Sequence, residues 1–158
     1  MINKIKSLLL ILLVTACTSN TPQTSLTSPN GELSITVFID KSHQLKYQVS
    51  RDQNIVIQTS ALGLKLNDRD LTSKLQLKSS SEISRVSENY HLFTGKQSDV
   101  TYQANEQTFV FQNENKQEFA VTFRISNDGV AFRYQVLGDN NTQVTVIDEA
   151  TSFAFSAN

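Results

Sequence analysis

Apolar and polar residues alternate along most of the chain after residue 28, and this period of two constrains the fold more than any other feature. Residues 33–39 and 45–49 place Leu, Ile, Val or Tyr at every second position. Residues 119–125 and 130–136 show the alternation most clearly, with Phe, Val, Ile or Tyr on one face. This pattern is typical of strands that bury one face. We therefore expect strands rather than helices.

A short turn separates the two clearest strands. It contains Asn127, Asp128 and Gly129. An Asp-Gly pair between alternating runs predicts a tight hairpin, because the favoured hairpin turns need positive φ angles. These residues therefore have a predicted structural role. Arg133 lies one position after Phe132 in the second strand, so we expect its side chain on the face opposite the aromatic core.

The whole pattern predicts an all-β chain. About ten short strands separated by turns, with no sustained helical period, indicate an antiparallel β-sandwich or barrel. The length of 158 residues fits one domain or part of a larger one. Residues 87–98 are the longest break in the alternation and predict an exposed loop. Because such loops often carry function, His91, beside Tyr90 and Phe93, is a candidate contact residue.

The N-terminus has the three-part pattern of a secretory signal. Lys4 and Lys6 precede an apolar run over residues 8–14, which is too short to cross a bilayer. Ala16 then precedes Cys17, the only cysteine of the chain. The sequence around these two residues resembles a bacterial lipobox, which predicts cleavage after Ala16 and lipid attachment to Cys17. The alternative is an ordinary signal peptide with an incidental cysteine.

These features divide the chain into three parts. Residues 1–16 are the predicted lipoprotein signal peptide, and residues 17–28, rich in Ser and Thr, are a predicted flexible tether. Residues 29–158 are the predicted β-domain. A lipid on Cys17 would hold the protein on a membrane. We expect a cell-envelope lipoprotein, on the outer membrane or the periplasmic face of a Gram-negative bacterium.

Composition and motifs exclude several chemistries. A net charge of −1 argues against a nucleic-acid partner, and a single cysteine argues against a cysteine-based zinc site. No Gly-x-Ser-x-Gly nucleophile motif is present. The two histidines, His43 and His91, lack metal-ligand spacing. The residues therefore predict no catalytic group, no metal ligand and no cofactor within this chain.

Four motifs, in this order and spacing, resemble one protein family. They are SPNGELSITVFID (residues 28–40), ALGLKLND (61–68), FAVTFRISNDGVAFRYQV (119–136) and EATSFAFS (149–156). Together they resemble the N-terminal β-sandwich of glycoside hydrolase family 97. The resemblance implies a sandwich of the galactose-mutarotase-like super-sandwich type. It also implies that residues 29–158 hold this domain in part, incomplete at the C-terminus.

The same resemblance carries expectations about function. Members of the family are calcium-dependent α-glucosidases and α-galactosidases. Their catalytic carboxylates lie in a (β/α)₈ barrel that follows the sandwich, and such a barrel needs roughly 250 residues of its own. That catalytic barrel is therefore the expected partner, and no residue here inherits a catalytic or calcium-binding role. Arg133 is expected to face the barrel or another sheet.

Two other functions remain open from the sequence. The domain could be a stand-alone carbohydrate-binding lipoprotein, because sandwiches of this kind occur in sugar-processing proteins. It could also be a structural lipoprotein of the cell envelope. A carbohydrate partner would require exposed aromatic rings, and the chain has four Tyr and no Trp.

Overall fold

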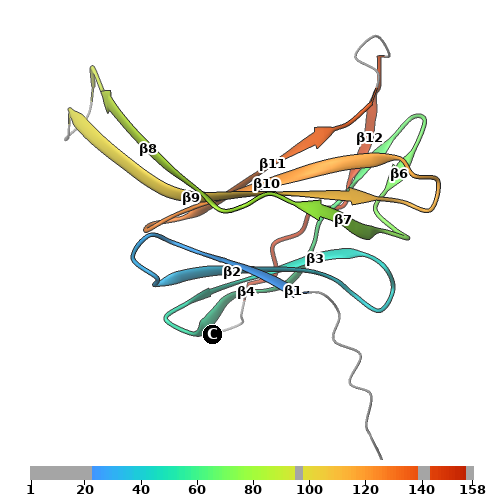
Figure 1. The fold of residues 1–158 in the computed structure, drawn as a ribbon, viewed down its shortest axis with the longest axis horizontal. Coiled ribbons are helices and arrows are strands. Elements are labelled where there is room, and N and C mark those ends of the chain that lie inside the picture. Colours follow the sequence, from blue (N-terminus) through green and yellow to red (C-terminus); the bar gives the residue numbers. More distant parts are fainter. Residues whose placement is uncertain (1–22, 95–97, 139–142, 156–158) are drawn as a thin grey trace, which may run out of the picture.

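A computed structural model describes residues 23–94, 98–138 and 143–155, and this part of the chain contains strands, turns and no helix. Two antiparallel sheets face each other, and a third, smaller sheet closes one end (Figure 1). The prediction of an all-β antiparallel sandwich is confirmed. Within the described residues, no helix is both long and apolar enough to traverse a lipid bilayer.

The N-terminal sheet is a simple meander. It has the order β1-β2-β3-β4, with neighbours antiparallel. Its strands are β1 (Gln23–Thr27), β2 (Leu33–Ile39), β3 (Leu45–Arg51) and β4 (Asn54–Ala61). Short links join them, so each strand pairs with its sequence neighbour.

The large sheet contains the longest strands. Its main path is β11-β10-β9-β7, and β8 also pairs with β9. The strands are β7 (Gln76–Ser80), β8 (Ser84–His91), β9 (Asp99–Gln112), β10 (Glu118–Ser126) and β11 (Val130–Val136). The longest of them, β9, runs from Asp99 to Gln112 without interruption.

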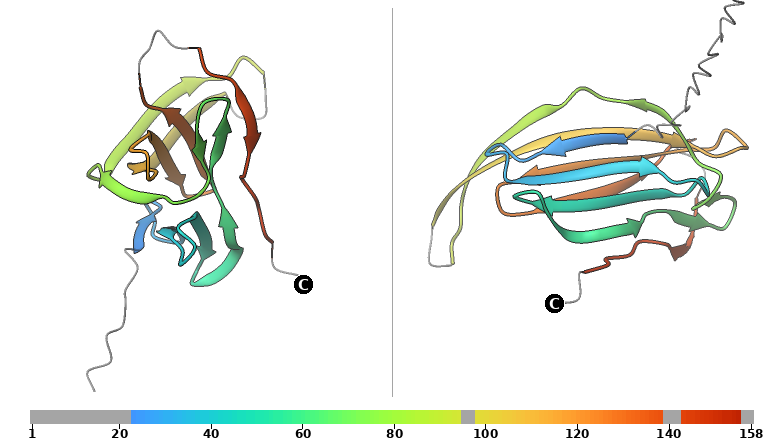
Figure 2. Two further views of the ribbon diagram at one scale, coloured as in Figure 1. Left: turned by 90° about the vertical axis from the view of Figure 1, so that its right-hand side faces the viewer. Right: turned by 90° about the horizontal axis from the view of Figure 1, so that it is seen from below.

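The small sheet brings together distant parts of the chain. Its order is β12-β5-β6, with the strands β5 (Leu64–Leu66), β6 (Asp70–Leu71) and β12 (Val146–Glu149). Figure 2 shows the same layers from two further sides, with β12 and the segment after it running down one end.

The core lies between the two larger sheets. The second and third strands of the N-terminal sheet alternate buried and half-buried residues, as the period of two predicts. From the large sheet, β9 and β10 contribute the largest buried side chains, Phe109, Phe111, Phe119 and Phe123. Phe109 contacts Phe123 edge to face at a centroid distance of 6.0 Å, an arrangement that aromatic rings favour.

The predicted tether is wrong in part. Residues 23–27 form β1, which pairs along its length with β2, although the prediction placed them in a flexible segment. Leu26 explains the difference, because its side chain is only 1% exposed and belongs to the core. Residues 17–22 of the predicted tether, Ala16, Cys17 and the predicted signal peptide lie outside the described residues.

The prediction of a loop over residues 87–98 is wrong for residues 87–91, and residues 95–97 lie outside the described residues. Residues 87–91 belong to β8, and Asp99 begins β9, with His91 paired to Asp99. The two strands project from the body as a two-stranded ribbon (Figure 1), which we call the arm and define as residues 84–91 and 99–106. Because most side chains of β8 are exposed, this strand shows no apolar alternation.

The segment after β12 continues the N-terminal sheet at its edge. An isolated bridge pairs Phe155 with Ile57 in antiparallel orientation. Gln58 N donates a hydrogen bond of 2.7 Å to Ala154 O, and Ser152 N donates one of 3.1 Å to Ala61 O. Residues 152–155 therefore lie along the free edge of β4.

Candidate functional site

His91 lies at the tip of the arm rather than inside a loop. Its Nδ1 lies 2.9 Å from Oδ1 of Asp99, and both side chains are exposed. Its ring meets that of Phe93 edge to face at 6.0 Å, and Phe93 is 98% exposed. The tip of the arm, together with the adjoining Phe93, thus presents an imidazole, a carboxylate and an aromatic ring to solvent at one place.

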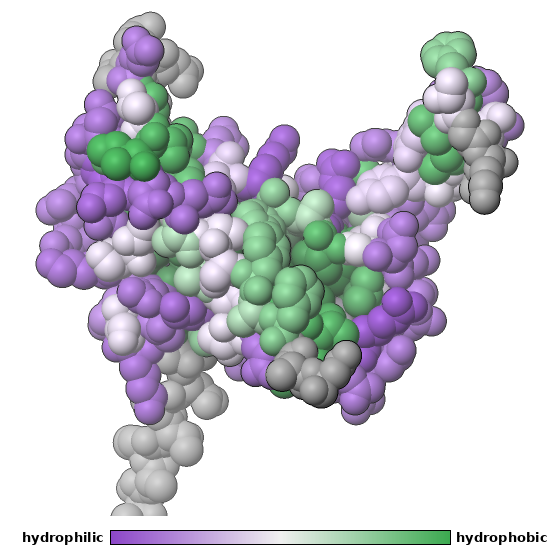
Figure 3. All heavy atoms as spheres, turned by 180° about the vertical axis from the view of Figure 1, so that it is seen from behind, coloured by the Kyte–Doolittle hydropathy of each residue, from purple (hydrophilic) through white to green (hydrophobic). Residues whose placement is uncertain are grey.

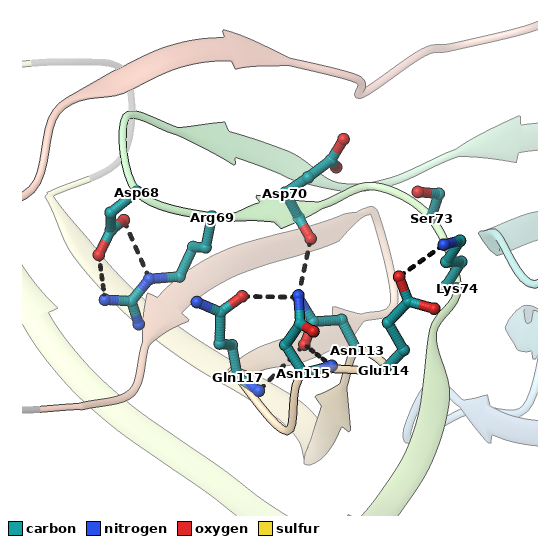
Figure 4. A pocket seen from close by; sticks show the side chains of 9 residues that line it. All are labelled: Asp68, Arg69, Asp70, Ser73, Lys74, Asn113, Glu114, Asn115 and Gln117. Atoms are coloured by element: carbon teal, nitrogen blue, oxygen red, sulfur yellow. Dashed lines mark hydrogen bonds and ion pairs between the residues drawn. The ribbon is translucent and has the colours of Figure 1, made fainter.

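A polar depression of about 360 Å³ lies where the turn between β5 and β6 meets the turn between β9 and β10 (Figure 4). Asn113 organises it. The Asn113 side-chain nitrogen donates to Asp70 O at 3.1 Å and to Gln117 Oε1 at 2.8 Å. Its side-chain oxygen accepts hydrogen bonds of 3.0 Å from the backbone nitrogens of Asn115 and Gln117. These contacts hold one turn closed and join it to the small sheet.

The charged groups around this depression are already paired. Asp68 accepts two hydrogen bonds from Arg69, at 2.5 and 3.0 Å, and Lys74 contacts Glu114 at 2.5 Å. The hydrogen bond from Arg69 holds the pKa of Asp68 below its usual value. The hydroxyl of Thr72 donates to Asp70 at 2.6 Å and likewise lowers the pKa of that carboxyl.

These pKa directions exclude one catalytic role. Glycoside hydrolysis needs a general acid, a carboxyl whose pKa is raised so that it still carries a proton near neutral pH. Asp68 and Asp70 have lowered pKa values and are ionised at that pH. Neither carboxyl therefore supplies the protonated member of an acid–base pair.

The described residues do not fit a calcium site either. Across residues 23–94, 98–138 and 143–155, no group of three or more His, Cys, Asp or Glu could hold a metal ion. Calcium takes six to eight oxygen ligands. The carboxylates that line the polar depression instead contact Arg69, Thr72 and Lys74.

The hairpin between β10 and β11 is where the sequence predicted it, but its turn differs. Ile125 pairs with Val130, and Ser126 N donates to Gly129 O at 2.9 Å, so Asn127 and Asp128 form the tip. Neither they nor Gly129 has a positive φ angle, so the predicted positive-φ Asp-Gly turn is wrong.

Side-chain contacts stabilise this turn instead. The Ser126 hydroxyl donates to Asp128 Oδ1 at 2.5 Å. Asn127 Oδ1 accepts a hydrogen bond of 3.0 Å from the backbone nitrogen of Asn30, in the turn before β2. The motif therefore fastens the large sheet to the N-terminal sheet, a role that sequence spacing alone did not reveal because it depends on a residue 97 positions away.

Arg133 lies on the outer face of the large sheet. It pairs with Thr122, whereas its neighbour Phe132 points inward and contacts Tyr47 and Phe123. The side chain of Arg133 is exposed and lines a depression of about 240 Å³ together with Glu106 and Arg124. The structure thus places Arg133 opposite the aromatic core.

An apolar surface lies on the flank where β4, β11 and the last described segment come together. Phe153 and Phe155 are 55% and 71% exposed, and Ile55 and Val56 of β4 are 44% and 40% exposed. The ring of Phe153 stacks against Phe132 at 6.3 Å. We call these five residues the open flank, and Figure 3 shows apolar side chains gathered on this side of the molecule.

Comparisons with known proteins agree on one family. The family model described as Glycosyl-hydrolase 97 N-terminal matches residues 26–158. A probable retaining alpha-galactosidase of Streptomyces bingchenggensis is 34% identical over 116 residues, which span 69% of this chain and 18% of that protein.

Solved structures show the same fold. The crystal structure of a beta-arabinopyranosidase matches 84% of this chain and 21% of its own, with a TM-score of 0.79 and 33% identity. A glycoside hydrolase family 97 enzyme from Pseudoalteromonas sp. strain K8, solved in complex with panose, matches 84% of this chain and 20% of its own. Its TM-score is 0.75 at 24% identity. This chain spans about a fifth of the length of these relatives.

Proposed function

Because this chain belongs to the glycosyl-hydrolase 97 family, whose N-terminal domain model it matches over residues 26–158, we propose that it is the non-catalytic sandwich of an α-glycosidase. The substrates of the whole protein are α-glucosides or α-galactosides. The family match, together with a sandwich that superposes on solved family members, carries this proposal.

A non-catalytic role agrees with the chemistry of the polar depression. Retaining and inverting glycosidases both flank the scissile bond with two carboxyl groups, one of which has a raised pKa. Asp68 and Asp70 have pKa values lowered by Arg69 and Thr72, which is the opposite of what a general acid needs. In the proposed function, the acid and its partner carboxylate therefore belong to polypeptide outside this domain.

The relatives contain a long stretch of polypeptide beyond the region that matches this chain. The matched region fills only 18–21% of their length. In the function proposed here, the remainder completes the sandwich, forms the catalytic barrel and carries the calcium site, and the sandwich packs beside the barrel. The open flank and the outer face of the large sheet supply surface for this packing.

Membrane attachment is a further part of the proposal, and it rests on sequence alone. The pattern from Lys4 to Cys17 supports export, cleavage after Ala16 and lipid attachment to Cys17. More than one acyl chain gives stable anchoring, at about 0.8 kcal/mol for each buried CH₂ group. Cys17→Ser should remove radiolabelled palmitate from the protein and release it from the membrane fraction.

One experiment tests the central proposal. The whole gene is expressed, and its product is assayed with nitrophenyl α-galactoside and nitrophenyl α-glucoside alongside the 158-residue chain. We expect hydrolysis of at least one substrate by the full product and none by the 158-residue chain. Activity in the 158-residue chain, or a gene with no hydrolase domain, would refute the proposal.

Direct carbohydrate binding is the second candidate function, and the tip of the arm favours it. Sugars stack on exposed aromatic rings, and Phe93 stands beside the paired His91 and Asp99. Titration of the 158-residue chain with maltose and melibiose, followed by NMR, should shift resonances of these residues. Unchanged spectra at millimolar sugar would eliminate this candidate.

A further inference from the structure

Strand β1 leaves only a short stretch of chain between the domain and the lipid proposed for Cys17. β1 begins at Gln23, so residues 17–22 are all that separate the site of the lipid from the first described strand. Six residues span at most about 20 Å, even if fully extended. The predicted tether of residues 17–28 would have had about twice that reach. Attachment through Cys17 would therefore hold one end of the sandwich close to the bilayer.

The pairing of β1 identifies which end that is. Gln23 pairs with Phe38 near the end of β2, just before residues 40–44 link β2 to β3. The backbone nitrogen of Leu75, which precedes β7, donates to His43 O at 2.8 Å. The start of β1, the link between β2 and β3, and the start of β7 therefore lie together. We define the anchor end as residues 39–43 and 75–77.

The tip of the arm lies at the opposite end of the molecule (Figure 1). β9 runs from Asp99 at this tip to Gln112, which pairs with Gln76 at the start of β7. At about 3.3 Å per residue, the two ends of β9 are roughly 40 Å apart along the strand. An attachment within about 20 Å of Gln23 thus favours contact of the anchor end, and not of the arm, with the membrane.

The anchor end has the side chains of an amphipathic surface. A groove of about 320 Å³ lies there, and Ile39, Leu75 and Leu77 contribute apolar side chains to its lining. Lys41 and His43 line the same groove, and both are exposed. An apolar groove beside an exposed lysine fits the boundary of a bilayer, where a lysine stem lies along apolar groups and its ammonium meets lipid phosphates.

The carboxylate that lines this groove is already engaged. Oδ1 of Asp40 accepts hydrogen bonds of 2.9 Å from the backbone nitrogens of Ser42 and Gln44. Its Oδ2 lies 3.8 Å from Nζ of Lys46. Asp40 therefore presents little negative charge to repel anionic lipid, and Lys41 presents a positive charge that attracts it.

We propose that the anchor end rests on the phospholipid surface of the membrane, with Lys41 at the headgroup phosphates and the arm directed away from the bilayer. This inference rests on the proposed lipid attachment to Cys17 and adds the surface that faces the membrane. A single lysine is attracted only weakly to an anionic surface. The short connection to Cys17 therefore has to keep the anchor end at a high local concentration beside the lipid.

Fluorescence quenching by nitroxides on lipid headgroups tests this orientation. Ser42→Cys in the anchor end and Ser87→Cys in the arm each place a thiol at an exposed position for a fluorescent maleimide. Cys17 does not compete in the lipidated protein, because the lipid occupies its sulfur. Each lipidated protein is purified from a Gram-negative host and reconstituted in vesicles of phosphatidylethanolamine and phosphatidylglycerol that carry the nitroxide. We expect quenching at position 42 to be at least threefold stronger than at position 87.

A longer connection gives the matched control. About twelve Gly and Ser residues inserted between Thr18 and Ser19 leave Cys17 and both of its neighbours unchanged, and they behave as a flexible chain. The local concentration of the anchor end beside the lipid falls as the connection lengthens. We expect quenching at position 42 to fall at least twofold in this variant, and quenching at position 87 to stay low.

The outcomes separate this inference from the proposed lipid attachment. Radiolabelled palmitate on the protein, with quenching at position 87 equal to or stronger than that at position 42, would refute the anchor end and leave the attachment intact. Strong quenching at position 42 that the longer connection does not reduce would mean that the contact is independent of the connection, and would also overturn the proposal. A protein without palmitate that stays in the soluble fraction would remove both.

Discussion

The backbone nitrogen of Asn30 donates a hydrogen bond of 3.0 Å to the side-chain oxygen of Asn127, and this bond joins the two sheets of the sandwich at one end. A second bond strengthens the same end, because Asn105 Nδ2 donates to Thr27 O at 2.8 Å. The residues of the predicted hairpin motif therefore act between sheets as well as within one.

Removal of the Asn127 side chain should loosen this end. Asn127→Ala leaves the Asn30 nitrogen to solvent, and a bond of this kind contributes about 1 kcal/mol to the free energy of unfolding. Urea unfolding followed by circular dichroism measures the loss. Asn89→Ala, at an exposed position of β8, is the matched control and should change the free energy by less than about 0.5 kcal/mol. Equal effects of the two variants would contradict the inter-sheet role.

Substitution by alanine should change the stability of the fold in opposite ways at two glycines. A Cβ at Gly63 would lie 2.9 Å from Leu71 O, and its φ of +153° is one that other residues rarely adopt. Gly63→Ala should therefore destabilise the fold by about 1–3 kcal/mol. A Cβ at Gly129 would meet no atom within 4 Å, and the residue has no positive φ. Gly129→Ala should be neutral or stabilise by up to about 1 kcal/mol, because it restricts the unfolded chain. Thermal unfolding of both variants tests the contrast. A large fall in the Tm of Gly129→Ala would contradict the observed turn and indicate that Gly129 needs a positive φ angle.

The hydroxyl of Tyr134 should contribute to the free energy of unfolding. Tyr134 Oη accepts a hydrogen bond of 3.0 Å from Gly63 N and lies 2.8 Å from Thr151 Oγ1, so it joins β11 to the link between β4 and β5 and to the segment after β12. Tyr134→Phe should cost about 1–3 kcal/mol of unfolding free energy, because it leaves a half-buried N–H without an acceptor. Tyr90→Phe, on the exposed arm, should leave the urea midpoint unchanged. If Tyr134→Phe left the free energy of unfolding unchanged, water would have replaced the hydroxyl as hydrogen-bond partner at no cost in stability.

The same tyrosine predicts alkaline destabilisation. Burial raises the pKa of Tyr134, and burial likewise raises that of Tyr47. Above pH of about 10 the unfolded chain loses these protons while the fold keeps them, so unfolding releases protons. The free energy of unfolding should therefore hold below that pH and decline as the pH rises through the folded pKa values. Tm measured from pH 8 to about 11.5 tests this, and Tyr134→Phe should flatten the decline. A Tm independent of pH over this range would contradict it.

The open flank should make the 158-residue chain self-associate. Large exposed apolar patches mark interaction surfaces or association-prone sites. Sedimentation equilibrium should show an average mass that rises with protein concentration, and Phe155→Ser should reduce that rise. Phe93→Ser removes an even more exposed ring from the arm and should have no such effect. If only Phe93→Ser abolished association, the arm and not the flank would be the associating surface.

Sequence patterns identified the strands that bury one face, and missed those that do not. Residues 33–39, 45–51, 119–126 and 130–136 alternate because the core lies on one side, so their strands were predicted nearly to the residue. β8 carries polar side chains on both faces, and only its pairing with β9 makes it a strand.

Turns were harder to predict because tertiary contacts decide them. The Asp-Gly pair indicated positive φ angles, yet Asn127 is fixed by a bond to Asn30 and the turn closes without them. Positive angles occur instead at Asp52 and Gln53, between β3 and β4, where no glycine indicates them. Alternation alone predicts the face on which Arg133 lies, but it does not predict that Arg124 contacts Glu88 and Glu106, because those contacts depend on the register of three strands.

The small sheet has a consequence for synthesis on the ribosome. Strands β1 to β4 pair with their sequence neighbours and can assemble once about sixty residues have emerged. One edge of β5 can pair with β6 at once, but its other edge must wait for β12, which is made roughly eighty residues later. At translation rates of about 5–20 residues per second, that delay is on the order of 4–16 s. During this interval the nascent chain exposes an unpaired edge, so chaperones in the cell have a defined window in which to act on it.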